Sequence, residues 1–441
     1  VGLGSSGTLS VKGTGEFNVG GNLITGQYST TSAGNTSVGT LALGGNSITS
    51  IVGAVIAGNA TNSTGNIIVS DDASVSVMAH MYVANGTTST GNLTVSGGTL
   101  QVSNAFGIGA GYGSTGSLYV SGGNLIGSSS FQIGLRTNST AIGTFTGGLV
   151  STSGSFAVAN SEGVTATVSI EGGTVRSATG ISVASAATTN ASGVISISSG
   201  TLGTDTHINV ARTLSTSGAI YMTGGTLTAG GNLVLGNTLS AVTNATVSVM
   251  GGHANVGGVW GIDKGGYTVV GGTGTLAAGT LSVRNGGIFD GTLFVGAVSG
   301  APTNYARTDN LVLISGAKVR GDAYLSSTAK VTMQINGSTD GGADALIELG
   351  NLTGALGAVL TIDLSGFTIN AEDTISLASY LSGLNLDDIA VEFIGYDQSA
   401  WIVKELWNSG TLSMLIVIPE PALGGALLGL LALMLAVRRR K

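Results

Sequence analysis

A phrase that returns about every 25 residues constrains this chain more than any other feature of its sequence. It is written STGNLTVSGGTL at Ser89 to Leu100 and STGSLYVSGGNL at Ser114 to Leu125. Its glycine pair recurs at 25-residue intervals, at Gly97, Gly122, Gly147 and Gly172. If another turn-forming residue is allowed, the series extends at intervals of 24 to 27 residues to Gly20, Gly44, Asp71, Ser199, Gly224 and Gly251. A fixed period of this length predicts a solenoid.

Each period holds three short apolar stretches. The first alternates apolar residues with Ser, Thr or Tyr, as at Leu93 and Val95; the second is marked by Leu100 and the third by Phe106 and Ile108. Alternation with a period of two predicts strands with one buried face. The Gly, Ser and Asn corners between the stretches leave no room for a helix in each period.

Three strands in each turn predict an all-β fold, a right-handed parallel β-helix solenoid with coils of about 25 residues. Equivalent residues then stack as ladders, so we expect the column Phe106, Phe131 and Phe156 to be core. The glycine pairs suit the corners because they accept positive φ. Coils rise by about 4.8 Å, so the ten coils predicted for residues 1–264 form a rod on the order of 50 Å long.

The remaining sequence divides into three further parts. Residues 265–335 continue the β-helix with irregular periods, and residues 336–417 form an acidic C-terminal β capping region. Within that region we expect one short helix near Thr374 to Leu384, and Trp401 and Trp407 close the end of the stack. Residues 418–441 form a separate tail. The chain opens inside a repeat-like phrase, with no Met and no signal peptide, so we expect that an upstream segment has been removed or was never in this sequence.

Composition excludes several classes of protein. The 441 residues include 76 glycines, three prolines and no cysteine, and 8% are charged against 42% hydrophobic. Without a Gly-X-Y period the chain is not collagen, and its hydrophobicity argues against disorder. The net charge is −7 and no basic stripe is present, so we expect no nucleic-acid partner.

The tail has three consecutive parts. Pro419, Glu420 and Pro421 come first, an uncharged run from Ala422 to Val437 follows, and a basic stop-transfer cluster ends the chain with Arg438, Arg439, Arg440 and Lys441. The uncharged run predicts a single transmembrane helix, slightly short for a ~30 Å hydrocarbon core. Because basic residues stay cytoplasmic, everything before Pro419 is expected to face outward.

This tail resembles the PEP-CTERM sorting signal, which has the same three parts in the same order. The resemblance covers about 24 residues. It implies export from a Gram-negative bacterium that makes exopolysaccharide, anchoring in the inner membrane, and processing by an exosortase near the Pro-Glu-Pro motif. The Gly-Gly-Thr-Leu phrase of the repeats is also similar to the passenger-associated repeats of autotransporters. No C-terminal barrel sequence follows here, so that secretion route is not implied.

One outward column is the candidate for contact with a glycan. It contains Thr94, Tyr119, Thr144 and Tyr221, with Ser169, Ser196 and Ser248 at the equivalent positions of other coils. Hydroxyl groups and aromatic rings on a flat array can hydrogen-bond to and stack against polysaccharide. The alternative is that exposed strand faces simply favour Thr and Ser.

Parallel β-helices also carry polysaccharide lyases and hydrolases, which need clustered charged residues. Glu171 and Arg176 flank the Gly172 corner and are expected to form an exposed ion pair with no catalytic role. His80, His207 and His253 fall in different columns and distant coils, so we expect no metal site. The loop from Asn336 to Asp344 lacks the final glutamate of a calcium-binding EF-hand.

The sequence therefore favours an exported, non-enzymatic, structural or adhesive protein of the cell surface or extracellular matrix. We expect no catalytic residue, no cofactor and no metal. The expected partners are an exosortase, the membrane through the tail, and exopolysaccharide. The alternative hypothesis is a polysaccharide lyase or glycoside hydrolase on the same scaffold.

Overall fold

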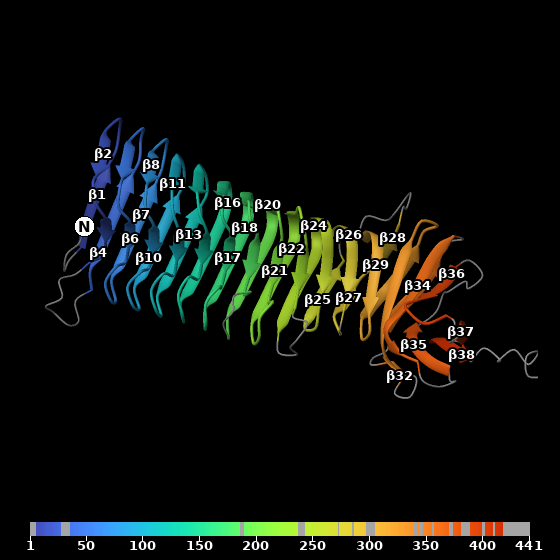
Figure 1. Ribbon diagram of the computed structural model, residues 1–441. Helices are drawn as coiled ribbons and strands as arrows, with labels where there is room; N and C mark the ends of the chain where they lie inside the picture. Colours follow the sequence, from blue (N-terminus) through green and yellow to red (C-terminus); the bar gives the residue numbers. More distant parts are fainter. Residues whose placement is uncertain are drawn as a thin grey trace, which may run out of the picture.

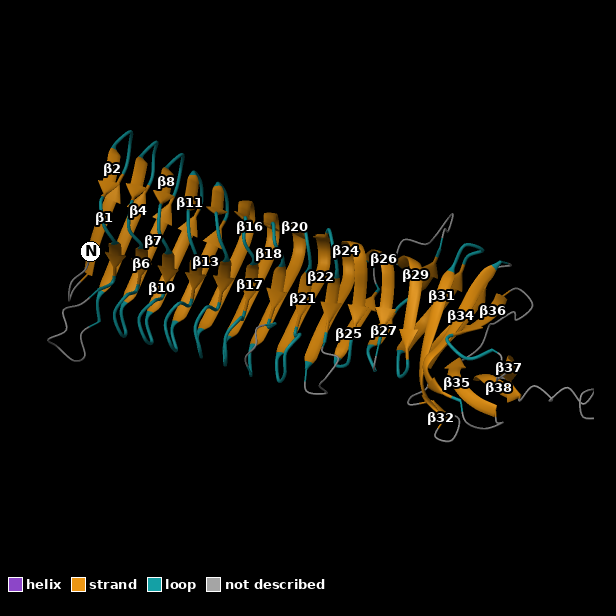
Figure 2. Ribbon diagram, in the orientation of Figure 1, coloured by secondary structure: helices purple, strands orange, loops and turns teal. Residues whose placement is uncertain are grey.

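In the computed structural model the chain forms a long stack of parallel β-strands with about eleven turns (Figure 1). The structure describes residues 6–417 except 28–35, 186–188, 237–242, 272, 285, 297–304, 339–341, 344–346, 355–356, 370–373, 381–388, 399–401 and 409–410. Every regular element in these residues is a strand, and no helix occurs among them (Figure 2). The predicted all-β parallel solenoid is confirmed, whereas its right-handed coil stays a prediction.

Three strands make up each regular coil and define three sheets that run along the rod. The first sheet begins with β1 (Ser6–Val11), β4 (Val38–Leu43), β7 (Thr64–Val69), β10 (Thr90–Val95) and β13 (Thr115–Val120). The second begins with β2 (Glu16–Val19), β5 (Ile48–Ile51), β8 (Ser74–Val77), β11 (Thr99–Val102) and β14 (Asn124–Gly127). The third begins with β3 (Leu23–Thr25), β6 (Val55–Ala57), β9 (Met81–Val83), β12 (Phe106–Ile108) and β15 (Phe131–Ile133).

From the sixth coil onward the first and second strands join into single long strands. These are β16 (Thr140–Thr152), β18 (Thr165–Ser177), β20 (Ser192–Thr204) and β22 (Ser217–Ala229), each followed by a short strand of the third sheet. The short strands are β17 (Phe156–Val158), β19 (Ile181–Val183), β21 (Ile208–Val210) and β23 (Leu233–Leu235). In β24 (Asn244–Ile262) all three strands are continuous.

The core consists of the ladders that the repeat predicts. Val95 pairs with Val120 and Val120 with Phe145, and all three side chains are buried. In the third sheet the rings of Phe106 and Phe131 stack with centroids 4.4 Å apart. Neighbouring coils therefore bury each other's apolar faces, which a single coil cannot do alone.

The two glycines of each pair are required at the corner for partly different reasons. Gly173 has φ +70, a left-handed conformation that glycine adopts without a steric penalty. Gly172 has ordinary φ, but a Cβ there would lie 2.3 Å from the carbonyl oxygen of Thr146 in the preceding coil. The first glycine is therefore required by close coil packing. The second is required both by the backbone turn and by packing, because a Cβ on Gly173 would lie 2.5 Å from the carbonyl oxygen of Gly148.

The prediction that Gly20 marks the first repeat is wrong. Val11 pairs with Leu43, and Val19 pairs with Ile51 in the second sheet, so Gly20 follows a second-sheet strand. The corner equivalent to Gly45, at φ +64, is Gly13, at φ +79. Residues inserted after the third strand of the first coil lengthen that period, which displaced the count based on glycine pairs.

Beyond Ile262 the coils become irregular, as far as β30. The strands are β25 (Gly266–Val270), β26 (Thr275–Val283), β27 (Ile288–Asp290), β28 (Leu293–Val295), β29 (Ala306–Ile314) and β30 (Lys318–Leu325). Arg307 at the start of β29 pairs on one side with Ala277 of β26 and on the other with Phe294 of β28. The strand order in this part of the sheet therefore differs from the order in the chain.

The C-terminal strands continue the sheet and then change direction. They are β31 (Lys330–Ser338), β32 (Gly342–Ala343), β33 (Ile347–Gly354), β34 (Ala358–Thr368), β35 (Thr374–Tyr380), β36 (Ile389–Ile394), β37 (Ile402–Asn408) and β38 (Thr411–Val417). β34 pairs in parallel with β36, whereas β38 pairs antiparallel with both β35 and β37. The helix predicted from Thr374 is wrong over residues 374–380, because the backbone there pairs with β33 and β38.

Candidate functional site

The candidate glycan-facing residues lie in one straight row on the outer face of the first sheet. Thr94 pairs with Tyr119, Tyr119 with Thr144, and the row continues through successive coils to Tyr221. Ser169, Ser196 and Ser248 occupy the same row, in the register that the repeat predicts. The alternation of buried and outward residues in each strand directs the row to the surface.

The two aromatic rings of this row are exposed but lie far apart. Tyr119 and Tyr221 are 41% and 44% exposed. Four coil steps separate them, which corresponds to about 19 Å along the rod. Tyr119 accepts a 3.4 Å hydrogen bond from the hydroxyl of Thr146 in the next coil. The row therefore offers two isolated rings and a strip of hydroxyl groups, not a continuous stacking surface.

A second polar row runs beside it and satisfies its own hydrogen bonds. The side-chain amide of Asn92 donates to Asn66 Oδ1 at 2.8 Å, and the hydroxyl of Ser117 donates to Asn92 Oδ1 at 2.5 Å. Asn66 in turn donates to Thr40 at 3.3 Å. These contacts link consecutive coils, so this part of the polar surface stabilises the stack.

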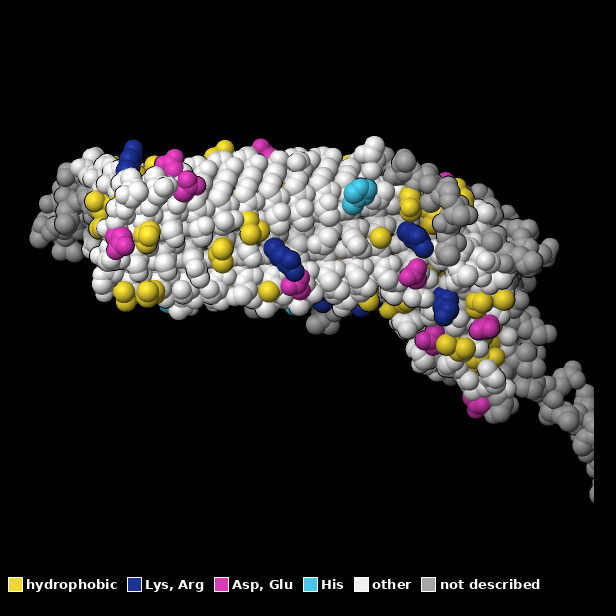
Figure 3. All heavy atoms as spheres, turned by 90° about the horizontal axis from the view of Figure 1, so that it is seen from above, with side chains coloured by type: hydrophobic (Ala, Val, Ile, Leu, Met, Phe, Trp, Pro, Cys, Tyr) yellow, Lys and Arg dark blue, Asp and Glu magenta, His cyan; other side chains and the backbone are white. Residues whose placement is uncertain are grey.

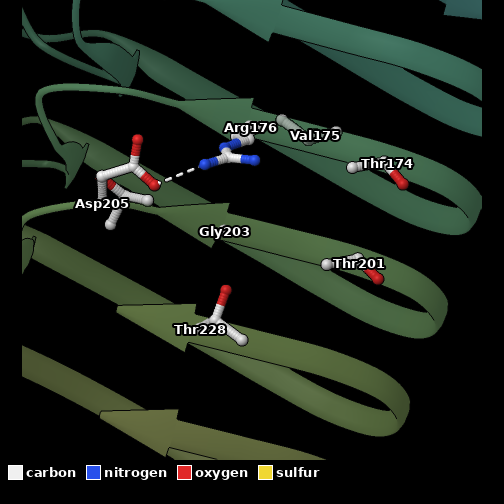
Figure 4. A pocket seen from close by; sticks show the side chains of 8 residues that line it. Thr174, Val175, Arg176, Thr201, Gly203, Asp205 and Thr228 are labelled. Atoms are coloured by element: carbon white, nitrogen blue, oxygen red, sulfur yellow. Dashed lines mark hydrogen bonds and ion pairs between the residues drawn. The ribbon is translucent and has the colours of Figure 1, made fainter. Parts of the chain in front are cut away.

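The outer face of the second sheet is hollowed around Arg176 (Figure 4). A depression of about 290 Å³ lies over Thr174, Thr201, Gly203 and Thr228, and Arg176 also borders a second depression of about 310 Å³. Gly203, in the coil after Arg176, pairs with it, and the missing side chain of Gly203 leaves the surface open. Repeat counting did not predict these hollows.

The predicted ion pair between Glu171 and Arg176 is wrong. Arg176 Nη2 lies 2.7 Å from Asp205 Oδ1, and Glu171 accepts a 2.9 Å hydrogen bond from the hydroxyl of Ser169. Gly203 and Asp205 belong to the same neighbouring coil, and Gly203 has no side chain to block the approach of Arg176 to Asp205. Both partners of the pair are more than half exposed, so the interaction contributes only about 0–1 kcal/mol.

Charged groups are few and scattered over the face of the rod in Figure 3. Across the described residues, no three His, Cys, Asp or Glu side chains come together to hold a metal ion. His80 and His207 both directly precede a third-sheet strand, so they share a column, contrary to the prediction, although many coils separate them. The His80 ring stacks on Tyr82 with centroids 5.6 Å apart.

Asp71 occupies a corner where other coils have glycine. Its φ is +55, and its carboxylate accepts a 2.8 Å hydrogen bond from the backbone N–H of Gly45. This bond, with a second from the Ser70 hydroxyl and a smaller effect of Lys12, lowers the pKa of Asp71 below its ordinary value of 3.8. Asp71 therefore helps to join two coils when it is ionised.

The tail motif and its basic cluster lie outside the described residues. This applies to Pro419, Glu420 and Pro421, to Arg438, Arg439, Arg440 and Lys441, and to Trp401. Within the part of the chain that the structure describes, no helix has the length and apolar character needed to cross a membrane. The membrane anchor and the sorting signal stay predictions.

Comparison with known proteins finds no match for this chain among family models, curated proteins or solved structures.

Proposed function

We propose that the protein is an exported, non-enzymatic rod of the bacterial cell surface or extracellular matrix, with a structural or adhesive role in the exopolysaccharide layer. Its C-terminal tail is a PEP-CTERM sorting signal, which anchors it in the inner membrane until an exosortase processes it near Pro419 to Pro421.

The observation that carries this proposal is the long, regular stack of coils with an outer surface of Ser, Thr, Asn and Gly. Each coil adds only one strand spacing of about 4.8 Å to the length, so the fold projects a uniform surface over a long distance. The rod has few charged side chains to attract polyions non-specifically, because only 8% of the residues are charged. Hydroxyl and amide groups at this density suit contact with hydrated polysaccharide.

The order of motif, apolar run and basic cluster supports processing at the tail. We expect the mature protein to end near Pro419 and to fractionate with the cell surface or the medium. Mass spectrometry of the mature C-terminus, combined with cell fractionation, tests this. A protein that keeps Arg438 to Lys441 and stays in the cytoplasm would refute the proposal.

The alternative function, a polysaccharide lyase or glycoside hydrolase, is tested separately. Purified protein is incubated with acidic and neutral glycans, and reducing ends and unsaturated products are measured. We expect no product. Sustained release of either product, lost on substitution of Arg176 or Asp205, would favour the enzyme.

A further inference from the structure

Three aromatic rings meet within the irregular coils, beside β28 and β30. The rings of Phe294 and Tyr324 stack with centroids 4.9 Å apart and planes inclined by 15°. Tyr305 approaches Phe294 edge to face at 5.4 Å and 82°. Tyr324 is 37% exposed and covers Phe294, which is 8% exposed. Tyr324 is therefore the most exposed ring of a three-ring cluster centred on Phe294.

The cluster continues the same outward row that contains Arg176 in the second sheet. Successive pairings place the members of this row in the order Arg176, Gly203, Thr228, Asn255, Ala277, Arg307, Phe294, Tyr324 and Thr353. Thr353 is small and exposed, and among the described residues only Phe294 makes a ring contact with Tyr324. With 37% of its surface exposed, Tyr324 can contact a ligand.

Arg307 lies directly beside Phe294 in this row. Its side chain is exposed and forms no ion pair with any residue that the structure describes, whereas Arg176, Arg212 and Arg284 each pair with an aspartate. A guanidinium offers a planar fork of N–H donors that fits a carboxylate. Asp309 is also exposed on the same strand, so the site is not a general polyanion surface.

We propose that Tyr324, Phe294 and Arg307 form a binding site for a carboxylate-bearing sugar of an acidic polysaccharide. The apolar C–H face of a pyranose ring packs on the Tyr324 ring, and the sugar carboxylate accepts hydrogen bonds from Arg307. The proposal rests on the proposed function in naming the glycan partner, and it places the contact on the second sheet instead of the Tyr119 row.

A single-stranded nucleic acid also combines rings with anionic groups, but the charge of this chain argues against a nucleic-acid ligand. Nucleic-acid binding depends on many cationic side chains along the backbone path. The protein has a net charge of −7, and Arg307 is flanked in the row by Ala277 and Phe294. One guanidinium beside one aromatic face matches one acidic sugar better than a run of phosphates.

Binding of the purified full chain to polygalacturonate, its methyl ester and oligo-dT, measured by calorimetry, tests this site. We expect wild type to prefer polygalacturonate. Tyr324→Ala should weaken binding about tenfold, since stacking contributes up to roughly 1.5 kcal/mol. The separate variant Tyr324→Phe keeps the ring and should bind about as tightly as wild type. Arg307→Gln should remove the preference for the free acid over the ester. The matched control Tyr112→Ala, at an exposed tyrosine outside both rows, should bind as wild type does.

Four results would overturn the proposal. These are no binding by wild type, tighter binding of oligo-dT or the ester, equal binding by wild type and Tyr324→Ala, or weaker binding by Tyr112→Ala instead. Thermal unfolding of each variant is recorded to check that it folds. If Tyr324→Ala does not fold, the loss of preference for the free acid in Arg307→Gln tests the proposal. The assay uses purified protein, so its outcome is independent of tail processing and cell fractionation, which test the proposed function.

Discussion

Arg212 and Asp263 are 51 residues apart in the sequence, yet Arg212 Nη1 lies 2.7 Å from Asp263 Oδ2. One coil lies between them, because Leu235 pairs with Val210 on one side and with Ile262 on the other. Arg284 Nε lies 2.7 Å from the other carboxylate oxygen, although without hydrogen-bond geometry. The Asp263 side chain is fully buried, so one carboxylate holds two guanidinium groups against the stack.

Replacing Asp263 with alanine should destabilise the rod strongly. It leaves two largely buried guanidinium groups without their carboxylate, and losing one partner of a buried pair costs about 3–5 kcal/mol. Urea unfolding followed by circular dichroism measures the change in the free energy of unfolding. The matched control Asp205→Ala breaks the exposed pair with Arg176 and should cost at most about 1 kcal/mol. Equal losses for the two variants would contradict this prediction.

Replacing Phe131 with alanine should cost about 3–5 kcal/mol, because the ring is buried between Phe106 and Phe156 and leaves a cavity when removed. Phe131→Leu keeps most of the apolar volume, as Ile181 and Ile208 do in the same column, and should cost less than half as much. Chemical denaturation of both variants provides the comparison. A similar loss for both would show that the stack does not depend on filling this column.

Gly173→Ala should destabilise the rod by about 3 kcal/mol or more, since the new Cβ would lie 2.5 Å from the carbonyl oxygen of Gly148. Gly13→Ala isolates the cost of backbone conformation: its φ is +79 and its Cβ would meet nothing within 4 Å. We expect about 1 kcal/mol there. The chain itself tolerates alanine at φ +57 in Ala84. Equal losses of unfolding free energy in Gly173→Ala and Gly13→Ala would contradict the prediction that close packing adds to the cost at Gly173.

The contribution of Asp71 should depend on pH. Its folded-state pKa is lowered by the bond from Gly45, so its stabilising effect is present above the unfolded pKa and is lost as the pH falls through the folded pKa. Asp71→Asn keeps a residue suited to positive φ and removes the charge. Wild type should therefore be more stable than this variant at neutral pH, with a difference that shrinks in acid. A difference that grows on acidification would refute the prediction.

The repeat made most of the fold predictable. Equivalent residues such as Val95 and Val120 stand a fixed distance apart in the sequence and also pair in space, because parallel coils repeat the same register. The same property placed Thr94, Tyr119, Thr144 and Tyr221 in one row. The prediction for Gly20 failed, since an insertion in a corner changes the count without changing the pairing of Val11 with Leu43.

The sequence by itself therefore determined the parallel stack, its buried columns and its outward rows wherever the period holds. Only the tertiary structure decided which side chains meet across coils of unequal length. Arg307 follows Phe294 in the chain but precedes it in the sheet, because the start of β29 pairs between β26 and β28. The period no longer records spatial order there, and the cluster of Phe294, Tyr305 and Tyr324 depends on that change of strand order.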